Sequence, residues 1–451
     1  MSVPRRAFLR RAALAGAAVT MPLSALAEAV RRNGGPTEAR GYGPLQPVLD
    51  DTTGLPLLHL PEGFRYHSLG WTGDALTGGS VTPGAHDGMA AFAGAGGLMH
   101  LVRNHEIEVR PAFDGRRCYD PGAGGGTTTL DIDAATGRVV RSAVSLAGTM
   151  RNCAGGPTPW GSWLTCEESV LGPDDDPALR EAHGYVFEVP ASGESTARPL
   201  KALGRFVHEA VAVDPHTGIL YQTEDADRAG LYRFVPDEAG RLRSGGRLQM
   251  LAVRGRPKAD LRRGQITNVP MGIYWVDIEV ADPGGRGRGV ELTVFEQGHR
   301  RGAATFARLE GAWFADGRLY VTSTSGGNAG VGQVWELGPA SEQLRLVYES
   351  PGVHELNMPD NLTVSARGGL VLCEDGTTNP CVHVLTREGQ IARLVRNNVV
   401  LNGERNGLRG DFRSSEFAGA TFSPDGRWLF VNVQRPGITM AITGPWERGP
   451  V

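Results

Sequence analysis

Lysine is almost absent from this chain, and long apolar stretches are confined to its first residues. Only Lys201 and Lys258 occur among the 46 basic residues. A GC-rich genome would produce this arginine bias, so the bias alone does not indicate phosphate binding. Beyond residue 27, no stretch reaches the roughly 18 uninterrupted apolar residues that a membrane-spanning helix needs. A membrane partner is therefore not expected.

Several catalytic motifs and most helical periodicity are also missing. The chain has no G-x-x-x-x-G-K-[ST] loop, no G-x-S-x-G elbow and no H-E-x-x-H helix, which removes support for P-loop, serine-hydrolase and zincin chemistry. The composition, with 40% apolar and 21% charged residues, is that of a globular protein. The 64 glycines and 29 prolines indicate many tight turns and favour an all-β architecture.

The N-terminal segment has the features of a targeting signal. Arg5-Arg6 precedes an apolar run of small residues, and Ala25-Leu26-Ala27 forms an A-x-A cleavage site. Residues 1–27 resemble a twin-arginine signal, which implies the twin-arginine translocase as a partner during export. The mature chain, 28–451, is then expected to be periplasmic or secreted. It retains 42 basic and 49 acidic residues, so no nucleic-acid-binding surface is indicated.

One unit recurs along the mature chain: a polar residue, an apolar strand, a turn with Asp or Gly, a second apolar strand and another polar residue. Clear copies are HEAVAVDPHTGILYQTED (208–225), EGAWFADGRLYVTSTS (310–325), PDNLTVSARGGLVLCED (359–375) and EFAGATFSPDGRWLFVNVQ (416–434). Looser copies occupy 86–106 and 151–169. The starts are about 50 to 66 residues apart, except for one gap of about 100, and this spacing is typical of propeller blades. The sequence predicts a single six-bladed β-propeller with an insertion at about 240–300.

Because each repeat is a hairpin, its first and last residues should meet at the same rim. If the paired strands are the inner ones, the rim of the central channel carries many converging acids, which repel one another unless cations neutralise them. A multi-metal cluster at one mouth of the channel follows. The rim residues are Asp87, Asn104, His105, Glu106, Cys153, Glu167, Glu168, His208, Glu209, Glu224, Asp225, Glu310, Asp360, Asn361, Glu374, Asp375, Glu416, Asn432 and Gln434.

The chain has five cysteines, an odd number for an exported protein. Cys153 and Cys166 face each other near the ends of one hairpin, where a disulfide is one reading. Against it, Cys153 stands where other repeats place Asp or Glu, and Cys166 stands one position before an acidic pair. We expect Cys153 to be a metal ligand and Cys166 to be a packing residue. Oxygen ligands favour Ca²⁺ or a trivalent cation, and one thiolate indicates a transition metal.

The segments NCAGGPTPWGSWLTCEES, GRFVHEAVAVDPHTGILYQTED, RLEGAWF, STSGGNAGVGQVWEL and MPDNLTVSARGGLVLCEDG resemble the PhoX-type alkaline phosphatase family. The resemblance covers about residues 45–447. It implies a monomeric, twin-arginine-exported hydrolase of phosphate monoesters, with Fe³⁺ and Ca²⁺ around a bridging oxo group and a role in phosphate supply.

Residue roles follow from the same resemblance. It implies Cys153 as the thiolate ligand of iron, with Glu209 and Glu310 as carboxylate ligands on the iron side. Arg308 and Asn104 match positions that hold phosphate. Calcium ligands would be Glu167, Glu224, Asp360 and Glu374, followed by Glu168 and Asp375.

Two other classes remain open from the residues alone. A calcium-dependent propeller hydrolase, such as a lactonase, phytase or phosphodiesterase, would use an acidic channel without needing Cys153. A non-enzymatic propeller would use calcium only to stabilise a binding hub. Iron content and the effect of an Arg308→Ala substitution distinguish these classes from a phosphatase.

Overall fold

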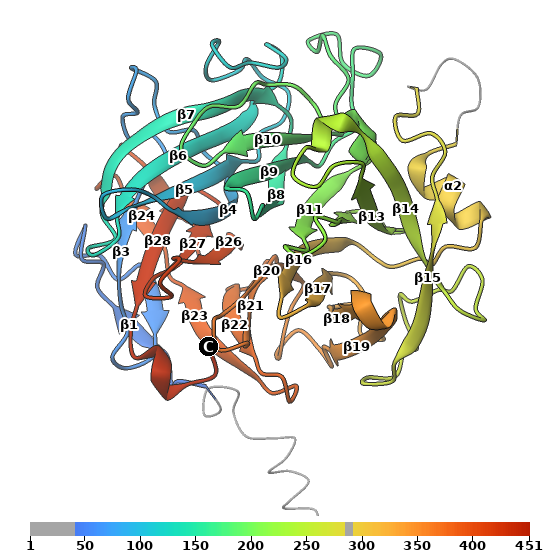
Figure 1. The fold of residues 1–451 in the computed structure, drawn as a ribbon. Helices are drawn as coiled ribbons and strands as arrows, with labels where there is room; N and C mark the ends of the chain where they lie inside the picture. Colours follow the sequence, from blue (N-terminus) through green and yellow to red (C-terminus); the bar gives the residue numbers. More distant parts are fainter. Residues whose placement is uncertain (1–40, 285–291) are drawn as a thin grey trace, which may run out of the picture.

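The computed structural model describes residues 41–284 and 292–451, and it is built almost entirely from antiparallel strands. The proposed signal peptide, 1–27, lies outside the described residues. Figure 1 shows sheets arranged radially around a central axis. The predicted all-β propeller class is confirmed. No helix in the described part of the chain has the length and apolarity that crossing a membrane requires.

The first three blades along the chain each begin with an inner strand. Blade 1 contains β4 (His86–Ala93), β5 (Leu98–His105), β6 (Gly125–Asp133) and β7 (Val139–Thr149). Blade 2 contains β8 (Asn152–Pro157), β9 (Ser162–Glu167) and β10 (Val186–Pro190). Blade 3 contains β11 (His208–Val213), β12 (Leu220–Glu224), β13 (Leu231–Pro236) and β14 (Gly246–Val253).

The remaining blades follow the same order from inside to outside. Blade 4 contains β16 (Leu309–Ala315), β17 (Arg318–Ser323), β18 (Gln333–Gly338) and β19 (Gln343–Glu349). Blade 5 contains β20 (Pro359–Val364), β21 (Leu370–Glu374), β22 (Cys381–Leu385) and β23 (Ile391–Asn397), extended by β2 (Leu58–Leu60) and β1 (Gln46–Val48). Blade 6 contains β26 (Phe417–Phe422), β27 (Leu429–Val433), β28 (Ile438–Thr443) and β3 (Arg65–Leu69).

The inner strands β4, β8, β11, β16, β20 and β26 each contact the next, and β26 contacts β4. These contacts close a ring of six inner strands around the axis (Figure 1). Because N-terminal β3 pairs with C-terminal β28, the two ends of the described chain close the circle within one sheet.

The segment at 240–300 contains one strand of the regular four-stranded blade and an insertion beyond it. Its β14 is the fourth strand of blade 3, whereas β15 (Met271–Asp277) pairs with β14 and with β19, joining blades 3 and 4 at their outer edges. Helix α2 (Val294–Arg300) follows, and Thr293 and Glu296 form a capping box at its N-terminus. Other short elements are β24 (Val400–Asn402), β25 (Arg409–Asp411) and the 3-10 turns Lys201–Leu203, Leu242–Ser244, Pro339–Ser341 and Trp446–Arg448.

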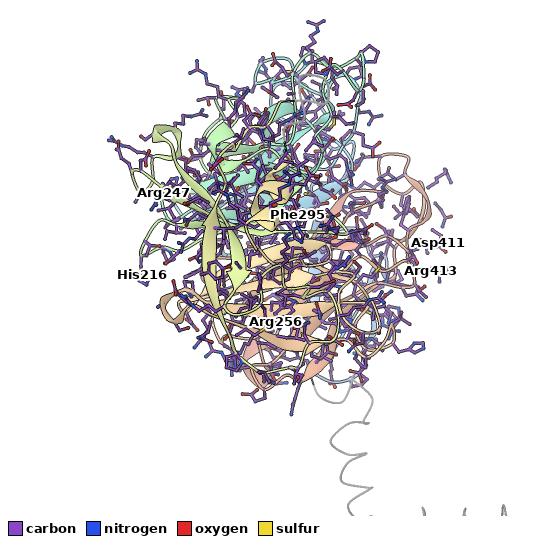
Figure 2. All side chains as sticks on the ribbon, turned by 90° about the vertical axis from the view of Figure 1, so that its right-hand side faces the viewer. His216, Arg247, Arg256, Phe295, Asp411 and Arg413 are labelled. Atoms are coloured by element: carbon purple, nitrogen blue, oxygen red, sulfur yellow. The ribbon has the colours of Figure 1, made fainter. Side chains whose placement is uncertain are left out.

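The apolar core lies between adjacent blades. Alternating strand residues from blades 5 and 6 form one cluster, which includes Val371, Val382, Phe417 and Leu429. The hairpin turns and the strand starts lie at opposite ends of the propeller. In Figure 2, His216 in the β11–β12 turn and Asp411 and Arg413 ahead of β26 lie on opposite sides of the molecule. One face therefore carries turns, and the other carries the rim residues.

Candidate metal centre

Every inner hairpin contains the same irregularity close to the rim. In each blade the inner strand advances three residues while its partner advances two, as between Asn152 and Gly155 opposite Glu167 and Thr165. Equivalent shifts follow His86, His208, Leu309, Pro359 and Ala418. A β-bulge inserts one residue and redirects its side chain.

The bulges account for which residues enter the channel. The first rim pair of a hairpin is the pair of opposed residues closest to the rim, such as Asn152 and Glu167. In five blades the inner-strand residue that follows this pair is an acid or a thiol: Asp87, Cys153, Glu209, Glu310 and Asp360. The next residue is small or polar because the neighbouring blade is close. A Cβ at Gly88 would lie 2.6 Å from the Cα of Ala154, and one at Gly311 would lie 2.4 Å from the carbonyl oxygen of Asp360. In blade 6 the bulge carries Gly419, and Glu416 supplies the acid from just ahead of β26.

A second set of acids comes from the residue immediately after β5, β9, β12 and β21. The five bulge residues that are acids or a thiol, Glu416 and this second set are together called the ring. Ligand atoms of Cys153, Glu168 and Glu209 lie within 4.8 Å of one another, as do those of a second group in the ring. The ring comprises Asp87, Glu106, Cys153, Glu168, Glu209, Asp225, Glu310, Asp360, Asp375 and Glu416.

Burial and mutual repulsion dominate the electrostatics of the ring. Burial, followed by repulsion from Asp360 and Glu168, raises the pKa of Glu209 well above its usual value. Burial and then repulsion from Asp375 raise the pKa of Asp360 to about 7. Burial also raises the pKa of the Cys153 thiol, and the nearby carboxylate of Glu209 adds to the effect. Without cations, burial and repulsion therefore favour the protonated forms of Glu209, Asp360 and Cys153, as expected where acids gather without a neutralising charge.

Two arginines border the ring. Nε of Arg308 donates to Asp225 at 2.9 Å, and Nη2 lies 2.5 Å from Glu310 and 3.7 Å from Asp375. Burial alone would lower the pKa of Arg308, but these carboxylates raise it, so the guanidinium stays charged. Its side chain remains 26% exposed. Arg308 can therefore meet an anion that enters from the rim.

Sequence reasoning missed the second arginine, Arg151. Its Nη2 lies 2.8 Å from Glu106 and 2.9 Å from Glu168. Arg151 precedes Cys153 by two residues, as Arg308 precedes Glu310, and both arginines have positive φ values of 45° and 42°. This shared position in two repeats was the signal that could have identified Arg151.

The predicted calcium ligands divide into two groups. Glu168, Asp360 and Asp375 belong to the ring, together with the predicted iron ligands Cys153, Glu209 and Glu310. Glu167, Glu224 and Glu374 do not, because successive strand residues point to opposite sides and these three end their strands one position earlier.

Each of these three carboxylates instead accepts hydrogen bonds within its own blade. Glu167 accepts from the backbone N–H groups of Met150, Gly184 and Tyr185 and from His183. Glu224 accepts from Gly230 N–H and the Tyr232 hydroxyl, and Glu374 accepts from Asn357 N–H and Cys381 N–H. They stabilise the backbone behind the ring.

Asn104, predicted to hold phosphate, is fully buried at the interface of blades 1 and 2. Its Nδ2 donates to the carbonyl oxygens of Cys153 at 2.9 Å and Ala154 at 2.8 Å. Its Oδ1 accepts from Trp163 Nε1 at 2.8 Å and Thr165 Oγ1 at 2.9 Å. These four bonds use the full capacity of the amide. The structure thus gives Asn104 a positioning role at the Cys153 bulge.

We expect Asn104→Ala to lower the free energy of unfolding by about 3 kcal/mol, because it leaves several buried donors and acceptors without partners. Thermal unfolding with metals bound measures this loss, and steady-state kinetics on the folded fraction gives KM. A variant of normal stability with a strongly raised KM would contradict the positioning role and restore direct contact with substrate.

The structure describes all five cysteines. All five are free thiols, so Cys153 and Cys166 form no disulfide. The thiol of Cys153 lies in the channel, 3.4 Å from the carbonyl oxygen of His208 in the next blade. Cys166 is fully buried and packs in an apolar cluster with Leu164, Val186 and Phe206.

The fold and the ring define a propeller whose channel mouth is lined with acids and bordered by arginines. A family model described as alkaline phosphatase PhoX matches residues 40–437. The chain therefore belongs to the PhoX alkaline phosphatase family, and its enzyme class is phosphatase. No curated protein sequence matches.

Similar solved structures include PhoX from Pseudomonas fluorescens in complex with vanadate, a transition state analogue. That chain shares 18% identity over 89% of this chain and 98% of its own length, with a TM-score of 0.63, which supports the fold. A gluconolactonase from Xanthomonas campestris is also similar, at 14% identity over 89% of this chain and 98% of its own, with a TM-score of 0.44.

Proposed function

We propose that this chain hydrolyses phosphate monoesters at the ring, with ferric and calcium ions as cofactors, outside the cytoplasm. The observation that carries the proposal is the convergence of six bulged hairpins on one thiol, many carboxylates and a charged arginine. On this proposal the mature protein is a monomer, exported through the twin-arginine translocase, that releases phosphate for uptake.

The donor set fits hard cations with one thiolate-binding metal among them. Oδ1 of Asp360 and Oδ1 of Asn361 are buried and accept no hydrogen bond. Both oxygens could therefore serve as metal ligands. Cys153, Glu168 and Glu209 combine a thiol with two carboxylates, a set that suits ferric iron. Asp87, Glu106 and Glu416 offer only oxygen, as calcium prefers.

The chain's own residues would bind and orient the substrate. Bound ferric and calcium ions would neutralise the ring and stabilise charge on the phosphoryl oxygens. Asp225 and Glu310 fix the guanidinium plane of Arg308, whose N–H groups can then bind two nonbridging oxygens. Positioning and charge stabilisation are the main requirements of phosphoryl transfer.

A cavity of about 490 Å³ lies between the rim ends of blades 2 and 3 and helix α2, and its described walls include neither Arg308 nor a ring residue. Its walls include Leu171, which follows Glu168 by three residues, and Val207 and Glu224, which precede ring residues; Phe206 and Arg228 add an apolar ring and a positive charge. The lining thus mixes apolar and charged side chains.

The two cysteines of blade 2 give a matched test. Cys153→Ser should lose iron and nearly all phosphomonoesterase activity, because a hydroxyl replaces the thiolate donor. Cys166 lies on the partner strand, opposite the bulge that contains Cys153, and faces the apolar cluster. Cys166→Ser should therefore keep both the iron and the activity. Iron and calcium contents, together with rates toward p-nitrophenyl phosphate, a phosphodiester and a lactone, measure the outcome. Active wild-type protein without iron, or a preference for the lactone, would contradict the proposal.

A further inference from the structure

A third group of potential metal ligands lies in blade 5, outside the ring. Glu374 ends β21, and Cys381 and His383 lie on β22. Their ligand atoms all lie within 4.8 Å of one another. The exposed fractions are 6%, 4% and 1%, so the group is sealed from solvent.

The strand register brings these three side chains together. Leu372 pairs with His383 and Cys373 pairs with Val382, which places Glu374 opposite Cys381. Because side chains alternate along a strand, Glu374, Cys381 and His383 point to one side of the sheet. Cys373 points to the other side and packs in the apolar core between blades 5 and 6.

Hydrogen bonding does not satisfy His383. Its Nε2 forms an ion pair with Oε1 of Glu374 at 3.0 Å, although the angles are poor for a hydrogen bond, and its Nδ1 has no hydrogen-bond partner. A buried polar group without a partner costs about 1–3 kcal/mol. Both oxygens of Glu374 already accept backbone N–H groups, at 2.7 and 2.8 Å, and each retains a second lone pair.

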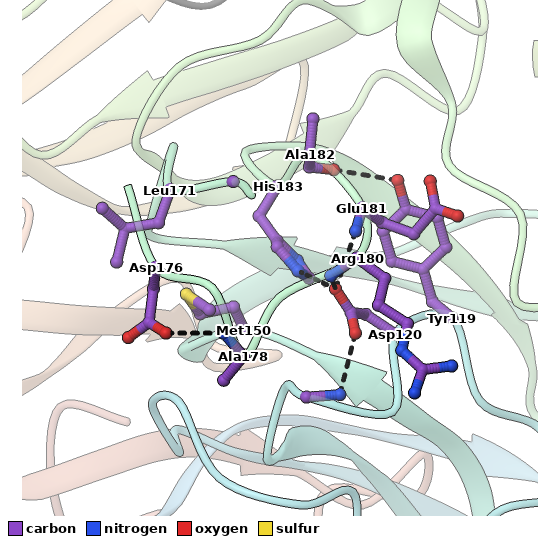
Figure 3. A network of polar contacts seen from close by, with 12 residues as sticks. Tyr119, Asp120, Met150, Leu171, Asp176, Ala178, Arg180, Glu181, Ala182 and His183 are labelled. Carbon is purple, nitrogen blue, oxygen red and sulfur yellow. Dashed lines mark hydrogen bonds and ion pairs between the residues drawn. The ribbon is translucent and has the colours of Figure 1, made fainter. Parts of the chain in front are cut away.

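In blade 2 the glutamate that ends the second strand also lies beside a histidine, and there hydrogen bonds alone satisfy the imidazole. There His183 Nδ1 lies 2.6 Å from Glu167, and Nε2 lies 3.4 Å from Asp120. Figure 3 shows His183 beside Asp120, which also accepts from the backbone N–H groups of Arg180 and Glu181. Both imidazole nitrogens of blade 2 therefore have partners. In blade 5 the group around His383 contains one carboxylate, that of Glu374, and the thiol of Cys381 in place of a second carboxylate.

We propose that Glu374, Cys381 and His383 bind a divalent transition-metal ion of the zinc class. A carboxylate, a thiolate and an imidazole are the usual zinc ligands, whereas calcium takes oxygen ligands. Burial alone would lower the pKa of His383, but the carboxylate of Glu374 raises it to about 9. Binding therefore releases two protons to solvent, one from the His383 imidazolium and one from the Cys381 thiol. The ion would tie β22 to the end of β21 and, through Asn357, to the chain entering β20. This site does not depend on the chemistry of the ring.

Zinc analysis of matched variants tests the site. The full-length protein is dialysed against Zn²⁺ and then against buffer, and its zinc, iron and calcium contents are measured. We expect Cys381→Ser and His383→Gln to hold one zinc equivalent less than the parent, with unchanged iron and calcium. Cys373→Ser, a buried thiol on the opposite side, should match the parent. Equal zinc contents in all four proteins would overturn the proposal.

A measurement on the parent alone covers variants that fail to fold. Crystals grown from the zinc-dialysed parent should give an anomalous difference peak at the zinc edge between the sulfur of Cys381 and the imidazole of His383. No peak at that position would overturn the proposal, whatever metals occupy the ring. If the parent shows this peak but has no phosphatase activity, the result contradicts the proposed function and leaves the zinc site supported.

Discussion

Arg308→Ala is expected to lower kcat toward p-nitrophenyl phosphate by about a thousandfold, the scale of a catalytic arginine in phosphoryl transfer. The guanidinium is held by Asp225 at 2.9 Å and by Glu310 at 2.5 Å, and it is the cation of blade 4 that reaches the ring. Its removal deprives the transferring phosphoryl group of a fixed, charged donor pair. Iron and calcium should remain bound, because Arg308 is not a ligand.

Arg318→Ala is the matched control. Arg318 belongs to the same blade but lies at the turn end of β17, where it pairs with Glu336 at 3.0 Å and is 49% exposed. We expect its kcat to stay within about twofold of the parent, since exposed ion pairs contribute little. An Arg308→Ala enzyme with normal kcat, or one that loses its metals and its activity together, would remove the proposed role of this arginine.

Removal of the metals is expected to abolish activity and to make stability fall as pH rises. In the metal-free fold, burial and Asp375 raise the pKa of Asp360 to about 7, and burial raises the pKa of Glu209 and Glu310 as well. In the unfolded chain these groups release their protons near pH 4. Between about pH 4 and 7 the folded state therefore binds more protons, so the free energy of unfolding decreases as pH increases.

The measurement is the Tm of chelated and remetallated protein between pH 5 and 8. A pKa difference of one corresponds to about 1.4 kcal/mol, and several ring acids contribute, so the metal-free Tm should fall by about 5 °C or more. Remetallated protein should not show this fall, because the carboxylates are then neutralised by cations. Parallel pH profiles for the two forms would indicate that the ring acids do not bind cations.

The propeller class was predictable because strand, turn and strand recur with polar residues at fixed ends. Repetition of this kind reveals sheets even where each strand alone is a weak signal. The same repetition placed Cys153, Glu209, Glu310 and Asp360 at one rim. Their entry into the channel depends on a bulge after the first rim pair, and the only trace of the bulge in the sequence is the residue that follows each of them, which is small in three cases and Asn361 in the fourth.

The acidic pairs at the ends of the second strands were harder to interpret. In Glu167-Glu168 and Glu374-Asp375, only the second residue joins the ring, and the strand end that decides this is set by hydrogen bonding rather than by composition. The contacts of Asn104 were hard to predict for a similar reason. Its proximity to the rim was predictable, but its bonds to the backbone of the next blade come from how two sheets pack, and no local pattern encodes that contact.

The six equivalent bulges give the protein six positions with the same backbone geometry that hold different side chains. Each blade contributes the backbone irregularity, while the residue in it varies from Asp87 to Cys153, Glu209 and, in blade 6, Gly419 without a break in the surrounding strands. A single substitution can therefore change the side chain at one bulge while the surrounding strands keep their arrangement. The backbone that presents the ligands is thus separable from the choice of ligand at each blade.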